Sequence, residues 1–396
     1  MIPIIKPVMD EHEVEAARRV ILSGWVTQGP EVAAFEKEFI TFVGATHACA
    51  VSSCTAGLHL ALLAVGVKPG DEVITASHSF IATANSIRYC GASPIFVDIE
   101  PGTFNMNPSL IEMLINEKTK AILCVHQLGM PCNLREIISI ARRHDLPVVE
   151  DAACAIGSEI LWNGSWEKIG KPHGDIACFS FHPRKLLSTG DGGMLTTAND
   201  EWDHQFRLWR QHGMSVPDTI RHGAKEVIFE SYPVLGYNYR MTDIQAAIGR
   251  EQLKRLPEIA ARRREMVDRY RALLTEEISE IGLPFEPEWA KSNWQSFCVR
   301  LPDGVSQKIV MQEMLDAGIA TRRGVMCAHR EESYGVKTWT CVQGPRACGC
   351  KAGECANLIE SEKAQDQCII LPLYHQMTDN DQIMIISYLR EACIKQ

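Results

Sequence analysis

The sequence predicts an α/β fold in which a mostly parallel central sheet, covered by helices on both faces, is followed by a smaller C-terminal α+β domain. Two observations lead to this prediction. Short apolar segments rich in β-branched residues recur between residues 72 and 197, and stretches of helical periodicity separate several of them. Buried strands that alternate with helices are typical of parallel sheets. In such sheets ligands bind beyond the carboxyl ends of the strands, so we expect the functional residues there.

The individual elements follow from local patterns. A helix over residues 11–22 places Val14, Ala17 and Ile21 on one face and ends at Ser23-Gly24, and residues 31–42 form a second amphipathic helix. Strands are predicted at 72–75, 94–98, 121–125, 147–150, 176–181 and 194–197. Helices are predicted at 56–65, 81–90, 108–115 and 134–144.

A long charged helix, predicted from Asp243 to about Leu274, leads out of the strand and helix region. Beyond it, a strand at 297–301 and a helix near 381–392 indicate the smaller domain. We therefore expect a large domain over residues 1–255 and a small C-terminal domain over residues 256–396, with a cysteine-rich insertion at 341–355.

The composition of the 396-residue chain is that of a soluble globular enzyme, with 46% hydrophobic and 22% charged residues. Its formal net charge of -9 argues against a nucleic-acid or membrane partner, because both require a basic surface. No apolar run approaches the roughly 18 residues that a membrane span needs. The N-terminus lacks the basic start and long apolar stretch of a signal peptide, so we expect a cytoplasmic protein.

Lys185 is the strongest candidate for chemistry. It follows the end of a predicted strand at Ser180-Phe181 and precedes a glycine-rich turn at residues 190–193. A lysine held at a strand end and partly desolvated can act as an amine nucleophile, whereas a lysine taken by itself is most often a solvated surface residue.

Two further segments contain residues that could act together with Lys185. Glu150-Asp151 ends an apolar strand, where a carboxylate can pair with a protonated pyridine nitrogen or serve only as a helix cap. Ser52-Ser53-Cys54-Thr55 opens a helix whose N–H groups can bind a phosphate, although these residue types are also ordinary caps.

Together with other motifs, these residues resemble the DegT/DnrJ/EryC1/StrS family of fold type I, pyridoxal-phosphate-dependent aminotransferases, which act mainly on keto-sugars. The similarity runs from about residue 3 to 265 and returns at Leu371-Pro372-Leu373-Tyr374. The matching motifs are the lysine with its glycine-rich turn, Glu150-Asp151-Ala152-Ala153, the serine-rich helix start, Ser23-Gly24-Trp25-Val26-Thr27-Gln28-Gly29-Pro30, and Gly236-Tyr237-Asn238-Tyr239-Arg240-Met241-Thr242-Asp243.

The resemblance implies a role for each matching residue. Lys185 would carry pyridoxal phosphate as a Schiff base and move the proton between the substrate α-carbon and the cofactor. Asp151 would pair with the pyridinium nitrogen, and Phe80 would stack on the ring. The phosphate would be held by Cys54, Thr55 and Ser180, and by Asn238 of the neighbouring subunit, so that the active unit would be a homodimer with shared sites.

Three more residues match positions near the active site of the family and are candidate substrate contacts, namely Trp25, His126 and His329. Each of them could instead serve packing or loop structure.

Two features depart from the family pattern. The family usually has Gln or His after Asp-Ala-Ala, where it hydrogen-bonds the 3′-oxygen of the cofactor, and this chain has Cys154, which is a weaker donor. The second feature is a cluster of four cysteines, Cys341, Cys348, Cys350 and Cys355. Four thiols at this density could bind zinc, but the paired C-x2-C spacing of zinc ribbons is absent. We assign no metal, which leaves a reduced loop or a local disulfide.

The resemblance implies that an amino group moves from glutamate or glutamine to a keto-sugar, which we expect to be nucleotide-linked, by a ping-pong mechanism through Lys185. Alternatives within enzymes are a sugar dehydratase that uses the same cofactor and an aminotransferase acting on a cyclitol. The dehydratases of the family have histidine at the lysine position, so Lys185 favours transamination. A regulatory protein that retains the fold is the alternative outside enzymes.

Overall fold

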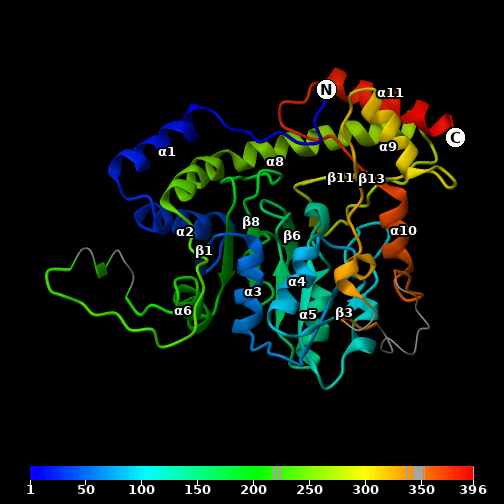
Figure 1. The fold of residues 1–396 in the computed structure, drawn as a ribbon. Helices are drawn as coiled ribbons and strands as arrows, with labels where there is room; N and C mark the ends of the chain where they lie inside the picture. Colours follow the sequence, from blue (N-terminus) through cyan, green and yellow to red (C-terminus); the bar gives the residue numbers. More distant parts are fainter. Residues whose placement is uncertain (217–219, 222–223, 336–337, 342–350, 352, 396) are drawn as a thin grey trace.

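A computed structural model of the chain describes residues 1–216, 220–221, 224–335, 338–341, 351 and 353–395. Its centre is a seven-stranded sheet with the strand order β1-β9-β8-β5-β4-β2-β3 (Figure 1). The strands are β1 (His47–Val51), β2 (Glu72–Ala76), β3 (Ser93–Val97), β4 (Thr119–Val125), β5 (Val148–Asp151), β8 (Ile176–Ser180) and β9 (Gly193–Thr197). β9 pairs antiparallel with both β8 and β1, and the other neighbours pair parallel, which confirms the predicted mostly parallel sheet.

Each face of the sheet carries its own hydrophobic core. Along β5, Val149 packs in one core with residues of α3 (Cys54–Ala64), α4 (Ile81–Tyr89) and α6 (Asp200–Trp209). Val148 points the other way, into a core shared with α2 (Pro30–Val43), α5 (Leu134–Arg143) and the first half of α8 (Asp243–Glu277). This alternation leaves the strand ends as the place where polar side chains can gather.

A further core lies at the other end of α8. The second half of this helix packs on α9 (Gln307–Asp316), α11 (Asp379–Ile394) and a small sheet of β11 (Phe297–Arg300), β13 (Cys368–Leu371) and β12 (Arg322–Arg323). Figure 1 shows α8 running across the molecule to reach α9 and α11. Residue 255 lies inside this continuous helix, so the division into residues 1–255 and 256–396 stays a prediction.

The remaining elements are short. β6 (Glu159–Trp162), β7 (Ser165–Lys168) and β10 (Ala290–Lys291) form a three-stranded sheet, and α10 (Ile359–Gln367) precedes β13. None of the helices within the described residues is both long and apolar enough to cross a membrane.

The predicted apolar face of the first helix is not the buried one. α1 (Glu11–Ser23) begins with Asp10 as its cap and ends at Gly24, as the sequence indicates. However, Val14 and Ile21 are 54% and 56% exposed, and α1 instead packs Ala16 and Val20 against Ala247 of α8. The apolar residues on the predicted face therefore remain on the surface of the single chain.

The helix predicted at 108–115 was wrong. The segment forms two 3₁₀ turns, Pro108–Leu110 and Glu112–Leu114. Its buried residues Ile111 and Leu114 are three positions apart, which suits the three-residue repeat of a 3₁₀ helix as well as one face of an α-helix. Periodicity over so short a segment could not separate the two.

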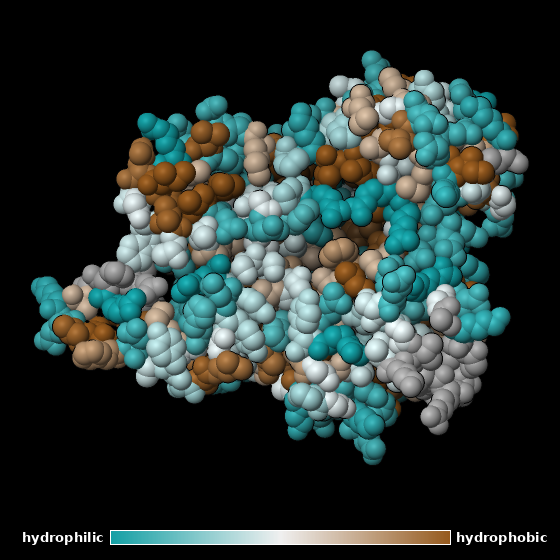
Figure 2. Space-filling view, viewed as in Figure 1, coloured by the Kyte–Doolittle hydropathy of each residue, from teal (hydrophilic) through white to brown (hydrophobic). Residues whose placement is uncertain are grey.

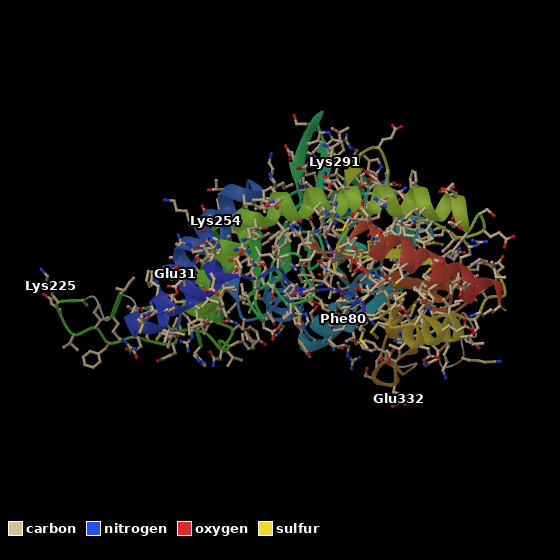
Figure 3. All side chains as sticks on the ribbon, turned by 90° about the horizontal axis from the view of Figure 1, so that it is seen from above. Glu31, Phe80, Lys225, Lys254, Lys291 and Glu332 are labelled. Carbon is tan, nitrogen blue, oxygen red and sulfur yellow. The ribbon has the colours of Figure 1, made fainter. Side chains whose placement is uncertain are left out.

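The chain between α6 and α8 extends away from the body. Its described parts project to one side (Figure 1), and Lys225 lies at the outer end, far from Phe80 (Figure 3). Val227, Phe229 and Leu235 in this arm are 83–90% exposed. Apolar side chains also gather over α1, and Figure 2 shows hydrophobic patches at the upper left and at the far left of the molecule, among others.

Candidate active site

Lys185 lies in the turn that follows β8. Its backbone N–H donates to the carbonyl of His182 at 2.8 Å, which closes the turn. Its Nζ donates to Sγ of Cys154 at 3.0 Å, so the half-buried amine points toward the segment after β5. Burial lowers the pKa of Lys185, but the Cys154 sulfur and the Asp151 carboxylate raise it by more, so the pKa of Lys185 is raised overall.

Asp151 ends β5 and is 5% exposed. Its Oδ2 accepts a hydrogen bond from Thr83 Oγ1 at 2.7 Å, and its Oδ1 accepts one from the backbone N–H of Ala153 at 3.1 Å. Burial raises the pKa of Asp151, and these two hydrogen bonds together with Lys185 offset part of that shift. The carboxylate is thus fixed in direction and lies close enough to Lys185 to act on its charge.

Phe80 is the N-cap residue that immediately precedes α4, and its carbonyl accepts from the backbone N–H of Thr83 at 3.1 Å. The same turn of helix therefore connects Phe80 to the hydroxyl that binds Asp151. The Phe80 side chain is 61% exposed, which is unusual for an aromatic residue beside a buried carboxylate. Figure 3 shows Phe80 near the middle of the molecule rather than at its periphery. Its ring is available to stack on a flat ligand.

The start of α3 offers donors for an anion. Ser53 caps the helix by accepting from the N–H of Ala56 at 3.1 Å, while the N–H groups of Cys54 and Thr55 have no acceptor within the described part of the chain. Ser180, at the end of β8, pairs in register with Gly193, which in turn pairs with the end of β1 just before Ser53. Free amides at a helix start, with a serine hydroxyl close by, form a phosphate-binding arrangement.

Gly193 makes this arrangement possible. A Cβ at this position would lie 2.6 Å from the carbonyl carbon of Ser53 and 2.7 Å from the amide nitrogen of Cys54. Any larger residue would push β9 away from the first turn of α3. The sheet and the helix start can approach each other only because this residue has no side chain.

These groups match the parts of one cofactor. Four groups lie along the same edge of the sheet: the Lys185 amine, the Asp151 carboxylate, the exposed Phe80 ring and the phosphate-binding arrangement at the start of α3. We call this last group, the N–H groups of Cys54 and Thr55 with the Ser180 hydroxyl, the anion cradle. The four groups correspond to the aldehyde, the pyridine nitrogen, the ring and the phosphate of pyridoxal phosphate. The donor set of the site therefore fits this group.

A family model decides the class of protein. The model for the DegT/DnrJ/EryC1/StrS aminotransferase family matches residues 7–390. The chain belongs to this family. It is an α/β protein of fold type I and a pyridoxal-phosphate-dependent aminotransferase, as the sequence predicts.

Individual relatives agree with this assignment over their full lengths. The spore coat polysaccharide biosynthesis protein SpsC of Bacillus subtilis (strain 168) is 34% identical over 394 residues, covering 98% of this chain and 96% of SpsC. The crystal structure of the aminotransferase TlmJ from Streptoalloteichus hindustanus has 31% identity and a TM-score of 0.86, with 100% and 99% of the two chains covered. The putative sugar aminotransferase Spr1654 from Streptococcus pneumoniae, in its PLP-form, has 27% identity and a TM-score of 0.87 over 100% and 99% of the chains.

Two candidate substrate residues are already engaged within this chain. His126 is fully buried; its Nδ1 accepts from the N–H of Cys132 at 3.0 Å and its Nε2 donates to Glu150 at 2.9 Å. His329 is 2% exposed and contacts Ser77 Oγ at 2.6 Å and Glu362 Oε1 at 3.0 Å. Both ring nitrogens of each histidine are thus used in holding strand ends and loops together.

Trp25 and Asn238 lie in other segments of the chain than the lysine, Trp25 between α1 and α2 and Asn238 before α8. The indole N–H of Trp25 donates to the carbonyl of Gln28 at 3.2 Å. Asn238 forms a β-bridge with Gln211, and its side chain is exposed in the single chain. The backbone carbonyl of the next residue, Tyr239, accepts from the N–H of Ser52 at 2.7 Å, so the chain beside Asn238 lies against the start of α3.

Two of the four clustered cysteines lie within the described residues. Cys341 and Cys355 are buried beside Phe96 and Trp339 in a small core, and Cys348 and Cys350 lie outside the described residues. Within the described residues, no group of three or more His, Cys, Asp or Glu side chains could hold a metal ion.

Sequence reasoning missed Thr83. Its 2.7 Å hydrogen bond to Asp151 joins residues 68 positions apart, and only the fold brings them together. The available signal was its position in the first turn of the helix that starts at Phe80, three residues after the predicted ring-stacking residue.

Proposed function

We propose that this aminotransferase moves an amino group from glutamate or glutamine to a nucleotide-linked keto-sugar, in a ping-pong reaction that runs through Lys185. The observation that carries the proposal is the position of the Lys185 amine, which is within reach of Cys154 and Asp151 beside the cradle at the start of α3. The description of Spr1654 as a sugar aminotransferase supports a sugar acceptor.

Each residue has a defined task in this proposal. Bound pyridoxal phosphate supplies an aldehyde for attachment and a ring that takes up electrons when the Cα–H bond of the donor breaks. Lys185 would hold the cofactor through its amine and would move the Cα proton of the donor. Asp151, fixed by Thr83 and Ala153, keeps the pyridine nitrogen protonated. Cys154 would be the weak donor toward the 3′-oxygen of the cofactor.

The anion cradle orients the cofactor in the proposal. The free amides of Cys54 and Thr55 and the hydroxyl of Ser180 would bind the phosphate, and the exposed face of Phe80 would cover the ring. A ligand held at these two ends cannot rotate, so the bond to be broken stays aligned with the ring and within reach of Lys185.

We also propose that the enzyme is a homodimer whose sites are shared. The exposed side chain of Asn238, at the base of the projecting arm, would reach the phosphate bound by the partner. The exposed apolar residues of α1 and of the arm, including Val14, Ile21 and Phe229, provide a surface that a second copy can cover.

The proposal is tested first by colour and then by product mass. The purified protein should absorb visible light through its lysine-bound cofactor, and glutamate or glutamine should bleach that absorbance. A panel of nucleotide-linked keto-sugars is then offered to the bleached protein, and the mass of the aminated sugar identifies the acceptor. A protein that binds the cofactor but is bleached by neither donor would contradict the proposed donors.

Lys185→Ala should abolish turnover while leaving the fold intact, because Lys185 is half-buried and its Nζ is hydrogen-bonded, within the described residues, to the thiol of Cys154. The variant should retain pyridoxal phosphate without a covalent bond. Turnover is measured with the identified donor, and covalent attachment by mass after borohydride reduction. Near-wild-type turnover in this variant would overturn the assignment of the lysine.

A further inference from the structure

The backbone on both sides of Lys185 is held by one side chain from a distant part of the sequence. Gln295 precedes β11 and is 5% exposed. Its Nε2 donates to the carbonyl of Arg184 at 2.5 Å, and its Oε1 accepts from the N–H of Leu186 at 3.2 Å. The amide therefore bridges the two residues that flank Lys185.

The segment that carries Gln295 is itself fixed. Its neighbour Trp294 has a left-handed backbone with φ near 50°, and the Gln295 N–H donates to Asn293 Oδ1 at 2.8 Å. Arg263 of α8 donates to the Gln295 carbonyl at 3.0 Å. These contacts fix the backbone of Gln295, and its buried side-chain amide is held by the hydrogen bonds to Arg184 and Leu186.

The same segment also holds the partner of the lysine amine. Asn293 Nδ2 donates to the carbonyls of Cys154 at 2.9 Å and Ile156 at 2.8 Å. One three-residue stretch, Asn293 to Gln295, thus binds the backbone of Cys154 and of the two residues that flank Lys185. Trp294 between them packs in the core at the far end of α8.

We propose that Gln295 is a positioning residue for Lys185, whose amide fixes the direction of the catalytic amine and ties it to the core around β11. This inference rests on the proposed role of Lys185. Proton transfer requires the amine to stay aligned with one C–H bond, and the two hydrogen bonds remove the backbone motion that would misplace it. Gln295 acts through Lys185 and does not touch the cofactor in this proposal.

The chain offers a matched control in Gln252 of α8. Its Oε1 accepts from the N–H of Ser188 at 3.4 Å in the same turn, three residues beyond Lys185. Its Nε2 donates to the carbonyl of Val8 at 2.6 Å and to Glu13 at 2.8 Å. Gln252 is as buried as Gln295 and has the same amide, but it does not flank the lysine.

The test compares Gln295→Met, Gln295→Asn and Gln252→Met in the cofactor-loaded enzyme. Methionine keeps the side-chain length and removes both hydrogen bonds, and asparagine keeps the amide but is one methylene too short to bridge both groups. The readouts are the pH midpoint of the visible absorbance of the bound cofactor, kcat and KM for the amino donor, and the thermal unfolding midpoint.

We expect Gln295→Met to lower kcat by roughly tenfold to a hundredfold, as small misplacements of a catalytic group do, with KM changed by less than about threefold. Its absorbance midpoint should shift by about half a pH unit or more, and Gln295→Asn should fall between Gln295→Met and the wild type. Gln252→Met should lower the thermal midpoint but leave the absorbance midpoint unchanged.

Two outcomes would overturn the inference. One is an unchanged kcat and absorbance midpoint in Gln295→Met or, if that variant does not fold, in Gln295→Asn. The other is an equal shift of the absorbance midpoint in Gln252→Met, which would show that any loosening of the turn has this effect. If the wild-type protein shows no lysine-linked absorbance, the proposed function itself fails, and this result is distinguishable from both.

Discussion

At the scale of single residues, burial and hydrogen bonding act in opposite directions on the pKa of Asp151. Burial favours the neutral carboxylic acid, whereas the hydrogen bonds from Thr83 and Ala153 favour the carboxylate and fix its direction. A protonated pyridine nitrogen placed against this oxygen would complete the set of partners that keeps Asp151 ionised. The cofactor and the carboxylate would then each maintain the charge of the other.

Asp151→Asn should keep the cofactor bound but remove the charge that keeps the pyridine nitrogen protonated. We expect the proton-transfer step to slow on the order of 10²-fold or more, as losses of well-placed electrostatic partners do. The step is measured in single-turnover experiments with deuterated donor, which report Cα–H cleavage directly. A loss of less than about threefold would mean that Asp151 serves only as a local cap.

The residues that could be predicted from sequence are those whose chemistry follows from local pattern. Lys185 after a strand, Asp151 at a strand end and Cys54 at a helix start were placed together by the rule that parallel strands end at one edge. His126 and His329 were not predictable in this way. Their ring nitrogens bind Glu150 and Glu362, 24 and 33 residues away, and these contacts depend on the packing of several elements.

At the scale of elements, the cradle depends on the contact between β9 and the start of α3. Gly193→Ala should weaken cofactor binding, because the added Cβ would meet Ser53 and Cys54 at 2.6–2.7 Å and force the two elements apart. We expect the dissociation constant of pyridoxal phosphate to rise on the order of tenfold, equivalent to about 1.4 kcal/mol. It is measured by fluorescence titration of the apo-protein.

Gly190→Ala is the control for this prediction. Gly190 lies in the same turn with φ near 87°, and an added Cβ would meet no heavy atom within 4 Å. Its cost is therefore conformational, about 1 kcal/mol of stability, with no displacement of the cradle. Equal losses of cofactor affinity in the two variants would show that the contact of β9 with α3 is not what matters.

Glu36 connects α2 to β1 and α6, and it gives the fold a defined acid sensitivity. It accepts hydrogen bonds from Arg210 at 2.5 Å, Arg207 at 2.8 Å and the N–H of Ala50 at 2.9 Å. Burial raises the pKa of Glu36, but the two arginines lower it by more, so the folded-state pKa lies below the unfolded value of about 4.3. The stabilisation is present above that pH and is lost as the pH falls through the folded-state pKa.

Glu36→Gln should therefore be less stable than the wild type by about 3 kcal/mol at neutral pH, because it leaves the buried guanidinium of Arg210 without its anion, whereas the half-exposed Arg207 keeps its ion pair with Asp203. The difference between the thermal midpoints of the two proteins should be constant from pH 7 to about 5 and shrink below about 4. A difference that grows on acidification would contradict the lowered pKa.

The strands β2, β3, β4, β5, β8 and β9 and the helices α3, α4 and α5 were predictable because each is apolar over its whole length or on one face. β1 and the β6–β7 hairpin were not predicted. β1 runs through His47-Ala48-Cys49-Ala50-Val51, which has few β-branched residues, and β7 carries the polar sequence Ser165-Trp166-Glu167-Lys168. β1 is a strand because it pairs with β9, and β7 is one because it pairs with β6. Neither pairing can be recognised from the local sequence.

At the scale of the whole molecule, the single chain leaves apolar surface uncovered on one side. Val14, Ile21 and Leu22 of α1 are 54–71% exposed, and the arm adds Phe229 and Leu235 (Figure 2). The sequence pattern marked Val14 and Ile21 as a face to be buried, and within one chain that face stays on the surface. A second copy that covers it would reconcile the pattern with the structure, and would bring the arm and Asn238 toward another active site.

The assembly prediction is tested by mixing two inactive variants, Lys185→Ala and Asn238→Ala. If Asn238 completes the site of its partner, a heterodimer has one site with both residues intact and one site with neither. Equal mixing gives heterodimers in half of the molecules, so about a quarter of the wild-type activity should return. If Asn238 instead serves its own chain, where the neighbouring Tyr239 binds Ser52, every site lacks one residue and no activity returns.

The two variants carry different affinity tags, so that heterodimers are isolated and counted, and each variant is assayed alone. Isolated heterodimers without activity, with Asn238→Ala inactive by itself, would rule out a site completed across the two-fold axis.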